Sequence, residues 1–416
     1  MSSTGREAVL AICGAGNAGH ALAVVASQRF AGDVVWLTST NERADLLRQR
    51  VFSGDGLQAA GVIEGTADRV RTISADPAEV IPQADIVLIP LPAFAHAPVL
   101  KRIAPYLKER VLFGVMPSRS GFEFEITGLV PELCANGRVA FGLQTLPWIT
   151  RMEEFGKRVR VDARKARVFA ATLPSEASET VAEQLTDLFD ISIVPEENFL
   201  SMTLANAGQI IHPGLMYGHF GSWNGATYSA DERPLFYIHA TDDGAEAVSR
   251  MSDEVVAIAT KIQASSFNAL DLSSVLHVHD WLRTTYPTQT RDFSTVASCF
   301  RTGPGVNVPC PMTEASPGEF VPNFAHRFLT EEVPFGLAVT RAIAELADVR
   351  TPAIDAIILW AQEKFGKEYL VDGKIAGRDA PKLPLPQNYG VHSLHALIDW
   401  YVPKDLPMRN RVHAVQ

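Results

Sequence analysis

A glycine-rich turn near the start of the chain constrains its fold more than any other feature. Residues 8–12 are apolar and predict a buried strand, and the stretch from Gly14 to Gly19 has the pattern Gly-x-Gly-x-x-Gly before a helical segment. The first glycine of such a turn permits the sharp bend, the second lets a pyrophosphate approach the backbone, and the third lets the helix pack close to the strand. The N–H groups that begin the helix then face the phosphates. We therefore predict a dinucleotide site formed by Gly14, Gly16, Asn17, Ala18 and Gly19.

The N-terminal half alternates between β-branched runs and helical stretches. After the first strand, further buried strands are predicted at residues 34–37, 85–89, 111–115 and 139–141. This alternation predicts an α/β fold, a Rossmann-like doubly wound sheet with helices on both faces. Three later runs, at residues 158–161, 166–173 and 191–194, are expected to extend the sheet. Residues 1–195 are thus the predicted dinucleotide-binding domain.

The pattern changes to helical periodicity from residue 199 onward. In residues 253–262, for example, Val256, Ala259 and Ile262 fall on one helical face. A chain of 416 residues is also long for a single core. We predict an all-helical domain over residues 199–416, with a substrate cleft between the two domains. Residues 301–322 contain five prolines and three glycines and predict a long functional loop.

Composition excludes several classes of function. The net charge of -10 gives no general attraction to nucleic acid or to anionic lipid, and no run reaches the ~18 apolar residues that a membrane span needs. Residues 1–6 are polar, unlike a signal peptide. The four cysteines form no CxxC pair, so neither a disulfide framework nor a metal site is predicted; they are Cys13, Cys134, Cys299 and Cys310. We expect a cytoplasmic protein.

The residues after the second predicted strand bear on the choice of cofactor. An NAD site usually has an acidic residue there for the ribose hydroxyls, but this chain has Thr38, Ser39 and Thr40. Together with Arg43, these hydroxyls could hold a 2′-phosphate, which favours NADP. Arg43 is equally well explained as a solvated residue of the following helix. The choice between NADH and NADPH therefore stays open.

Reduction beside a nicotinamide needs a proton donor, a cation for a substrate carboxylate and a group that orients the donor. His212 could be the donor because imidazole titrates near neutral pH, although a histidine among apolar residues is more often a core residue. Arg327 is followed by Glu331 and Glu332, which offers a cation and an orienting carboxylate. The same cluster is also typical of a solvated helix start with Thr330 as its N-cap.

A third candidate segment, residues 144–151, follows the end of a predicted strand, where ligands of open α/β sheets bind. It contains Gln144, Thr145 and Trp148, and Trp148 is alternatively a core residue.

Nearly the whole chain resembles the opine dehydrogenases of the octopine dehydrogenase type. The resemblance rests on many separate segments in the same order: the glycine turn, Pro92-Ala93-Phe94-Ala95-His96, Gly121-Phe122-Glu123-Phe124, Thr145-Leu146-Pro147-Trp148, His212-Pro213, Gly221-Ser222-Trp223, Pro234-Leu235-Phe236-Tyr237, Arg327 with Leu329-Thr330-Glu331, and Trp360-Ala361-Gln362-Glu363-Lys364. It implies a helical domain like the C-terminal domain of 6-phosphogluconate dehydrogenase. It also implies NAD(P)H-dependent reductive condensation of an amino acid with a 2-oxo acid, typically pyruvate, and is compatible with a homodimer.

The resemblance implies roles for individual residues. His212 matches the catalytic histidine of the family, Glu332 stands in place of its dyad aspartate, Arg327 matches a substrate arginine, and Pro92 lies in a cofactor-binding segment. Because glutamate is one methylene longer than aspartate, Glu331 could serve instead of Glu332.

Departures from the family pattern bear on the substrate. Neutral Gln144 replaces a glutamate, which argues against L-arginine as the amine. Asn206 and Gly208 replace bulkier residues and imply a differently shaped amine pocket, with Asn206 as in a bacterial relative that takes apolar amino acids. Arg119 replaces a glutamine and is interpreted as a second carboxylate clamp, a contact to a cofactor phosphate, or an exposed loop residue. Trp281 matches an aromatic residue of the amino-acid pocket, or is core.

Two rival functions remain open at this point. A simple 2-hydroxyacid or 2-oxoacid dehydrogenase would use the same fold and cofactor without an amine. A non-catalytic NAD(P)-sensing protein would bind the cofactor only, but it would need no proton donor such as His212.

Overall fold

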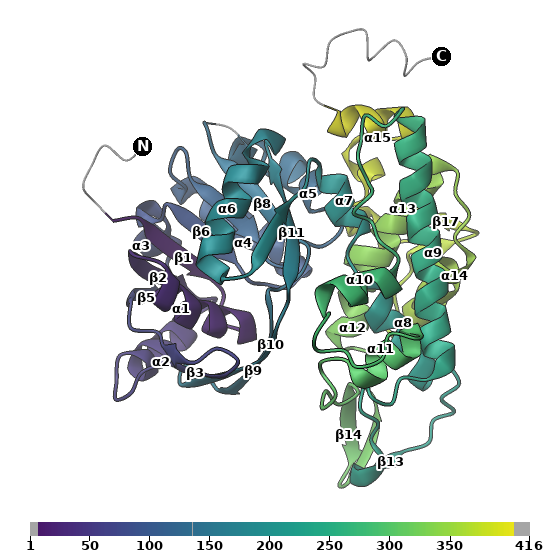
Figure 1. Ribbon diagram of the computed structural model, residues 1–416, viewed down its shortest axis with the longest axis horizontal. Coiled ribbons are helices and arrows are strands. Elements are labelled where there is room, and N and C mark those ends of the chain that lie inside the picture. The colour runs from purple at the N-terminus through teal and green to yellow at the C-terminus, as the bar shows by residue number, and fades with distance from the viewer. Residues whose placement is uncertain (1–6, 135, 403–416) are drawn as a thin grey trace. The chain divides into compact units, whose positions relative to one another are not determined.

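The computed structural model describes residues 7–134 and 136–402, and the chain divides into two compact units (Figure 1). Within the described residues, unit 1 comprises residues 7–118 and Glu125–Phe199, and unit 2 comprises Arg119–Phe124 and residues 200–402. The chain thus leaves unit 1 at Arg119, contributes six residues to unit 2, and returns to unit 1 at Glu125. Residues 1–6 and the side chain of Cys134, on which two of the sequence inferences rest, lie outside the described part.

Unit 1 is built on an eight-stranded sheet in the described part of the chain, with the order β12-β11-β8-β7-β6-β1-β2-β5. The strands are β1 (Val9–Cys13), β2 (Asp33–Leu37), β5 (Val70–Ser74), β6 (Ile86–Ile89), β7 (Leu112–Val115), β8 (Val139–Leu143), β11 (Arg167–Leu173) and β12 (Ser192–Pro195). Neighbours from β5 to β8 pair in parallel. Their order is the 3-2-1-4-5-6 order of doubly wound nucleotide-binding folds, which confirms the predicted fold class.

The central strands are buried because helices cover the sheet, and this explains their unbroken apolar sequences. Helices α1 (Asn17–Arg29) and α6 (Ser178–Phe189) lie side by side across it (Figure 1). Unit 1 also contains α2 (Asn41–Val51), α3 (Pro77–Val80), α4 (His96–Ile103) and most of α5 (Phe122–Leu129). All five strands predicted for the sheet's centre are confirmed, whereas β5 was not predicted.

One predicted extension of the sheet is wrong. Strand β10 (Arg158–Arg164) lies in a separate four-stranded sheet with the order β4-β3-β10-β9, together with β3 (Gln58–Gly61), β4 (Gly65–Thr66) and β9 (Trp148–Glu154). In β10, exposed and buried residues alternate. A strand with one exposed face does not fit inside a sheet that is covered on both sides. Strands β11 and β12 do extend the main sheet, as expected.

Unit 2 is mainly helical. Its helices in the described residues are α7 (Phe199–Leu204), whose first residue belongs to unit 1, α8 (Gly208–Phe220), α9 (Asp242–Ser265), α10 (Val278–Thr285), α11 (Val296–Thr302), α12 (Arg327–Thr330), α13 (Ala338–Ala347), α14 (Pro352–Lys364) and α15 (Leu394–Tyr401). Helices α8 and α9 pack at the centre through glycines. A Cβ atom at Gly218 would lie 2.4 Å from Cα of Gly244, so the helices approach this closely only because neither residue has a side chain.

Two small antiparallel sheets interrupt the helical pattern of unit 2. One contains β13 (Tyr228–Ser229), β14 (Met312–Ser316) and β15 (Glu319–Pro322), and the other contains β16 (Leu370–Val371) and β17 (Lys374–Ile375). The expectation of a structureless loop over residues 301–322 is therefore wrong at its second half. Most residues of β14 and β15 are at least partly exposed, so the hairpin lacks the apolar pattern that reveals a strand.

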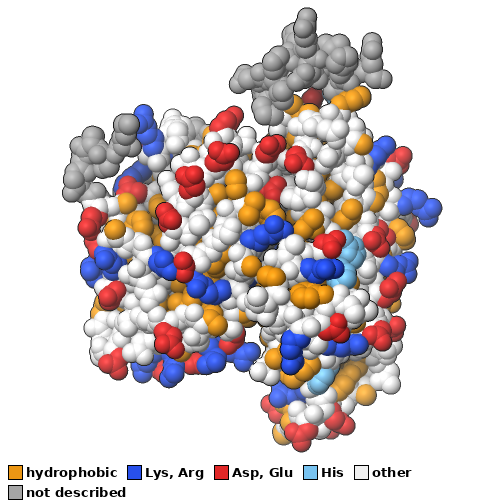
Figure 2. Space-filling model, in the orientation of Figure 1, with side chains coloured by type: hydrophobic (Ala, Val, Ile, Leu, Met, Phe, Trp, Pro, Cys, Tyr) orange, Lys and Arg blue, Asp and Glu red, His pale blue; other side chains and the backbone are white. Residues whose placement is uncertain are grey.

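The surface mixes charges of both signs. On the face shown in Figure 2, acidic, basic and apolar side chains are interspersed over each unit. No helix in the described residues combines the length and apolarity required to span a bilayer.

A buried histidine anchors the start of α1. Nδ1 of His20 lies 2.9 Å from the carbonyl oxygen of Gly16, and Nε2 accepts a hydrogen bond from the Gly156 N–H at 2.9 Å. The rings of Trp36 and Phe155 meet the imidazole edge-on. Burial lowers the pKa of His20 to about 4, because the charged imidazolium would lose its hydration.

This shift makes the stability of the protein pH-dependent. His20 titrates near 6.5 in the unfolded chain and about 4 in the folded one, so the unfolded state binds more protons in between. The free energy of unfolding should therefore fall as the pH drops from 6.5 to 4, by up to about 3 kcal/mol from this group. His20→Gln removes this contribution. The difference in free energy of unfolding between wild type and variant, measured by urea unfolding, should therefore narrow as the pH drops from 6.5 to 4. His395→Gln, at an exposed site, is the control; a gap for His20→Gln that does not change with pH would contradict the assignment.

Candidate active site

The glycine turn has the geometry of a phosphate-binding turn. Gly14 has φ +127°, and a Cβ atom there would lie 2.5 Å from Cδ2 of Leu91. A Cβ atom at Gly19 would lie 2.1 Å from the carbonyl oxygen of Gly14, so the close contact of strand and helix requires glycine. A Cβ atom at Gly16 would meet no described atom within 4 Å. Open space thus lies beside the N-terminus of α1, at the place where the sequence predicts the pyrophosphate of a dinucleotide.

Other predicted cofactor residues surround this turn. The side-chain amide of Asn17 donates to the Thr150 carbonyl at 3.4 Å, and Ala18 is buried. Pro92 precedes the short helical turn at Ala93–Ala95. These residues and the glycine turn belong to unit 1.

At the end of β2 the polar residues are ordered by local hydrogen bonds. Thr38 Oγ1 donates to the carbonyl of Thr40, and Thr40 Oγ1 caps α2 by accepting from the Arg43 N–H, while Ser39 is exposed. The Arg43 guanidinium lies 4.7 Å from the centre of the Phe155 ring and donates to the Ala15 carbonyl at 3.0 Å. Arg43 therefore contacts the glycine turn although it is exposed, and both interpretations of this residue stay open.

Two tryptophans assigned to the substrate lie in hydrophobic cores. Trp148 packs edge-on against Phe189 in unit 1 and is 2% exposed, and Trp281 packs edge-on against Tyr286 in unit 2. These positions favour the alternative that both are core residues. Gln144 is also buried, directly after β8. Thr145, beside it, is partly buried.

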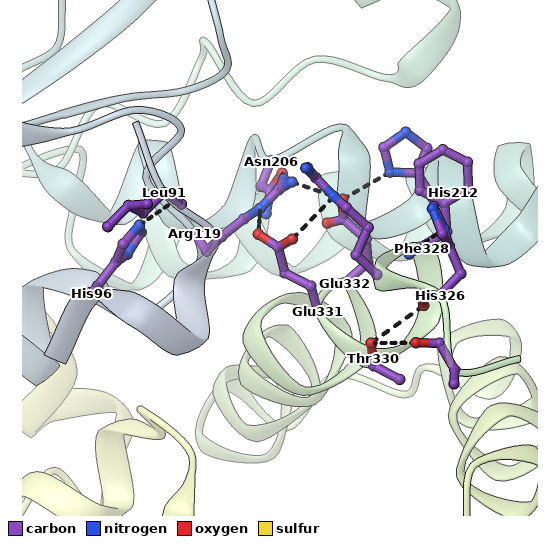
Figure 3. A network of polar contacts seen from close by, with 12 residues as sticks. Leu91, His96, Arg119, Asn206, His212, His326, Phe328, Thr330, Glu331 and Glu332 are labelled. Atoms are coloured by element: carbon purple, nitrogen blue, oxygen red, sulfur yellow. Dashed lines mark hydrogen bonds and ion pairs between the residues drawn. The ribbon is translucent and has the colours of Figure 1, made fainter. Parts of the chain in front are cut away.

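In unit 2, His212 and Glu332 form a hydrogen-bonded pair (Figure 3). Nδ1 of His212, on α8, lies 2.7 Å from Oε1 of Glu332, which follows α12 and is fully buried. The ring of Phe328 stacks on the imidazole at 4.1 Å between centroids. The Tyr237 hydroxyl lies 3.4 Å from Nε2. The structure thus chooses Glu332 over Glu331 as the partner of the histidine.

Arg119 joins this pair from a distant part of the chain. Its Nη2 lies 2.8 Å from Oε1 of Glu332, its Nε lies 3.1 Å from Oε1 of Glu331, and its Nη1 donates to Oδ1 of Asn206 at 2.9 Å (Figure 3). Arg119 is 6% exposed, so its interpretation as an exposed loop arginine is wrong. Burial raises the pKa of Glu332, but the Arg119 guanidinium and the His212 hydrogen bond outweigh it, and the pKa lies below its ordinary value.

Arg327 is more accessible to solvent than Arg119. Its Nε lies 3.3 Å from Oε2 of Glu331, and its side chain is 45% exposed. It begins α12, which is capped by His326 and not by Thr330: Nδ1 of His326 accepts from the Phe328 N–H, and Thr330 ends the helix. The predicted N-cap at Thr330 is therefore wrong, because the chain enters α12 one turn earlier.

Sequence reasoning missed Tyr237 and Phe328 as neighbours of His212. Tyr237 belongs to one of the segments that carry the family resemblance, but nothing in the local pattern relates it to a histidine on another element. The sequence therefore marked Tyr237 as part of a family segment, but it did not show that Tyr237 lies beside His212.

Comparisons with known proteins agree with this geometry. Residues 195–365 match the family model described as the alpha-helical domain of NAD/NADP octopine/nopaline dehydrogenase. Tauropine dehydrogenase from Arabella iricolor is 35% identical over 94% of this chain and 100% of its own length. The chain belongs to the opine dehydrogenase family. As a family member it is an NAD(P)-dependent oxidoreductase acting on CH–NH groups.

Solved structures of an opine dehydrogenase share the fold. Octopine dehydrogenase with NADH and L-arginine is 30% identical, with a TM-score of 0.81 over 94% of this chain and 98% of that one. Its complex with NADH and pyruvate is 29% identical over the same shares, with a TM-score of 0.79.

The role of Gly16 is testable apart from folding. Its φ of −94° suits alanine, and the added methyl group would occupy the space beside α1. Gly16→Ala should weaken NADH or NADPH binding by at least about tenfold, because the methyl group would keep the pyrophosphate from the backbone. A loss of about 1.4 kcal/mol of binding free energy lowers the affinity tenfold. The melting temperature without cofactor should not change.

Cofactor fluorescence titration and thermal unfolding check this prediction. Gly19→Ala provides the contrast, since its methyl group would collide with the Gly14 carbonyl and lower stability. Unchanged cofactor affinity in Gly16→Ala would exclude the glycine turn as the phosphate site.

Proposed function

We propose that this protein condenses the amino group of an amino acid with a 2-oxo acid and reduces the resulting imine with NADH or NADPH, and that it also runs the reverse oxidation. The product is an N-(1-carboxyalkyl) amino acid. The observation that carries the proposal is the hydrogen-bonded pair of partly buried His212 and fully buried Glu332, in which Glu332 holds Nδ1. Nε2, 3.4 Å from the Tyr237 hydroxyl, is the nitrogen proposed to meet a substrate. Pyruvate is the proposed 2-oxo acid, as in the octopine dehydrogenase complex.

His212 is the proposed acid and base of the condensation. Nε2 accepts a proton from the ammonium group of the amino acid, so that the free amine can add to the carbonyl carbon. A proton of the added nitrogen passes to the former carbonyl oxygen and gives a carbinolamine hydroxyl. The imidazolium then donates its proton to this hydroxyl, which leaves as water, and the protonated imine remains. Glu332 stabilises the imidazolium and fixes the orientation of the ring in both steps. The bound nicotinamide supplies the hydride that reduces the imine carbon.

Arg327 is the proposed clamp for a substrate carboxylate. Arg119 was an alternative, but all three of its guanidinium nitrogens already contact Glu331, Glu332 or Asn206. Among the described residues Arg327 forms an ion pair with Glu331 alone, and its side chain is exposed, so it can offer further N–H groups.

Asn206 supports a substrate pocket next to the pair. Its Oδ1 accepts from Arg119, and its buried Nδ2 has no hydrogen-bond partner among the described residues. Buried donors are rarely left unpaired, so this amide group is a proposed contact for the substrate. The neutral side chain of Gln144 keeps L-arginine an unfavourable amine. Cytoplasmic location and a homodimer stay predictions from the sequence.

A substrate panel distinguishes this function from its rivals. Purified protein should oxidise NADH or NADPH only when pyruvate and an amino acid are both present, with the condensed product seen by mass spectrometry. Turnover with the 2-oxo acid alone would indicate a simple hydroxyacid dehydrogenase. Cofactor binding without turnover on a panel covering apolar, polar and charged amino acids would favour a sensing protein.

His212→Asn should lower kcat by ~100-fold or more, the usual contribution of general acid–base catalysis. Cofactor affinity should be retained, since His212 lies in unit 2 and the glycine turn lies in unit 1. His219→Asn is a matched control on the same helix, because the His219 ring lies 3.0 Å from the Phe236 carbonyl and not beside Glu332. It should keep kcat within a few-fold. Equal losses in both variants would remove His212 from the mechanism.

A further inference from the structure

We propose that Arg119 is a positioning residue of this active site: its buried guanidinium holds the Glu332 carboxylate against Nδ1 of His212 and balances the charge of Glu331, so that the negative charge beside the imidazole stays compensated. This inference rests on the proposed function, because it concerns the same histidine. It assigns Arg119 to the His212–Glu332 pair, and not to the binding of a substrate carboxylate or a cofactor phosphate.

The first support is that all three nitrogens of the Arg119 guanidinium contact other side chains of the protein. Nη2 contacts Glu332, Nε contacts Glu331, and Nη1 contacts Asn206, each within 3.1 Å. Glu331 and Glu332 are both 0% exposed. Two neighbouring carboxylates without water need a countercharge, and a planar guanidinium can satisfy both at once.

The second support is the space in which Arg119 lies. A Cβ atom at Gly208 would be 2.8 Å from Nη1 of Arg119, 3.0 Å from Oε1 of Glu332 and 3.2 Å from its Oε2. Any side chain at position 208 would therefore push against the ion pair. Gly208, which the sequence suggested shapes the amine pocket, makes room for the arginine instead. The arginine at 119 and the glycine at 208 depend on each other.

The third support is the anchoring of the backbone around Arg119. The Ser120 N–H donates to the Phe335 carbonyl at 3.0 Å, and Ser120 Oγ donates to the Thr203 carbonyl at 2.7 Å. The Gly121 N–H donates to Thr203 Oγ1 at 3.0 Å. These bonds hold the segment in unit 2 without using the Arg119 side chain. A substitution at Arg119 therefore removes the charge and leaves the segment attached.

The charges that face His212 determine what this loss would do. Glu332 contacts Nδ1 and the Tyr237 hydroxyl lies near Nε2, while His326 and Arg327 act on the site from the start of α12. Glu331 and Arg119 lie behind Glu332. The two carboxylates balance the two guanidinium groups, so the cluster is neutral when His212 is unprotonated.

Without Arg119, the cluster would carry one uncompensated negative charge beside the imidazole. That charge stabilises the imidazolium, and a nearby charge typically moves a titration by 1 to 3 pH units. The proton would then be held more tightly, and the acid–base cycle would work best at a higher pH.

The experiment measures the His212 titration directly by NMR in protein labelled with ¹³C and ¹⁵N at histidine, with the signal assigned through His212→Asn. In Arg119→Gln the midpoint should rise by about one pH unit or more. The pH dependence of kcat/KM should shift in the same direction. Arg119→Lys keeps the charge and should restore most of the wild-type midpoint. An unchanged midpoint in folded Arg119→Gln overturns the proposal.

A matched control separates charge positioning from stability. Arg341 is another buried arginine of unit 2 that bridges two carboxylates, Glu345 and Asp355. Arg341→Gln should lower the melting temperature and leave the His212 midpoint unchanged. A rise as large as in Arg119→Gln would mean that loosening of the unit, and not the local charge, moves the titration, which overturns the proposal.

Gly208→Ala is the second test if Arg119→Gln does not fold. Its methyl group would press on Nη1 of Arg119 and on both carboxylate oxygens of Glu332 and so loosen the ion pair. The midpoint should again rise, and no change in midpoint overturns the proposal. The NMR titration needs no turnover. If the midpoint rises but no pair of substrates reacts, the proposed function fails while the charge balance by Arg119 stands.

Discussion

The compensation of buried charge is the constraint on which the candidate site depends. Glu331 and Glu332 are neighbours in the chain and both are excluded from water. Carboxylates in such a place cost several kcal/mol each unless cations and hydrogen-bond donors surround them. Arg119, Arg327 and His212 supply these groups from three different segments. The orientation of the imidazole follows, because its Nδ1 is committed to Glu332.

Absent side chains make room for charged groups in both units. At Gly16 the open space lies beside a helix N-terminus, which is the requirement for a pyrophosphate. At Gly208 the missing side chain leaves the space that the Arg119 guanidinium occupies. In the first case the charged group would be the pyrophosphate that the sequence predicts there, and in the second it is a side chain of the protein. Backbone that lacks a Cβ atom can approach either one closely.

Local patterns predicted the elements well where both sides of a strand are buried. The five central strands of unit 1 were identifiable because continuous apolar runs between helices leave few alternatives. The pattern was weaker where one face is exposed. Strand β10 was assigned to the wrong sheet, and the hairpin of β14 and β15 was taken for a loop. Pairing partners of such strands are chosen by contacts that are distant in sequence.

The sequence by itself determined the doubly wound sheet, the glycine turn and the candidate histidine, because each rests on residues that are close together in the chain. It left open whether Glu331 or Glu332 meets His212, and what Arg119 does. Only the tertiary structure decided these points: Arg119 is 212 residues from Glu331 and 87 from Asn206 in sequence, yet within hydrogen-bond distance of both. Ion pairing depends on separation in space and on exclusion of water, and both arise only when the chain has folded.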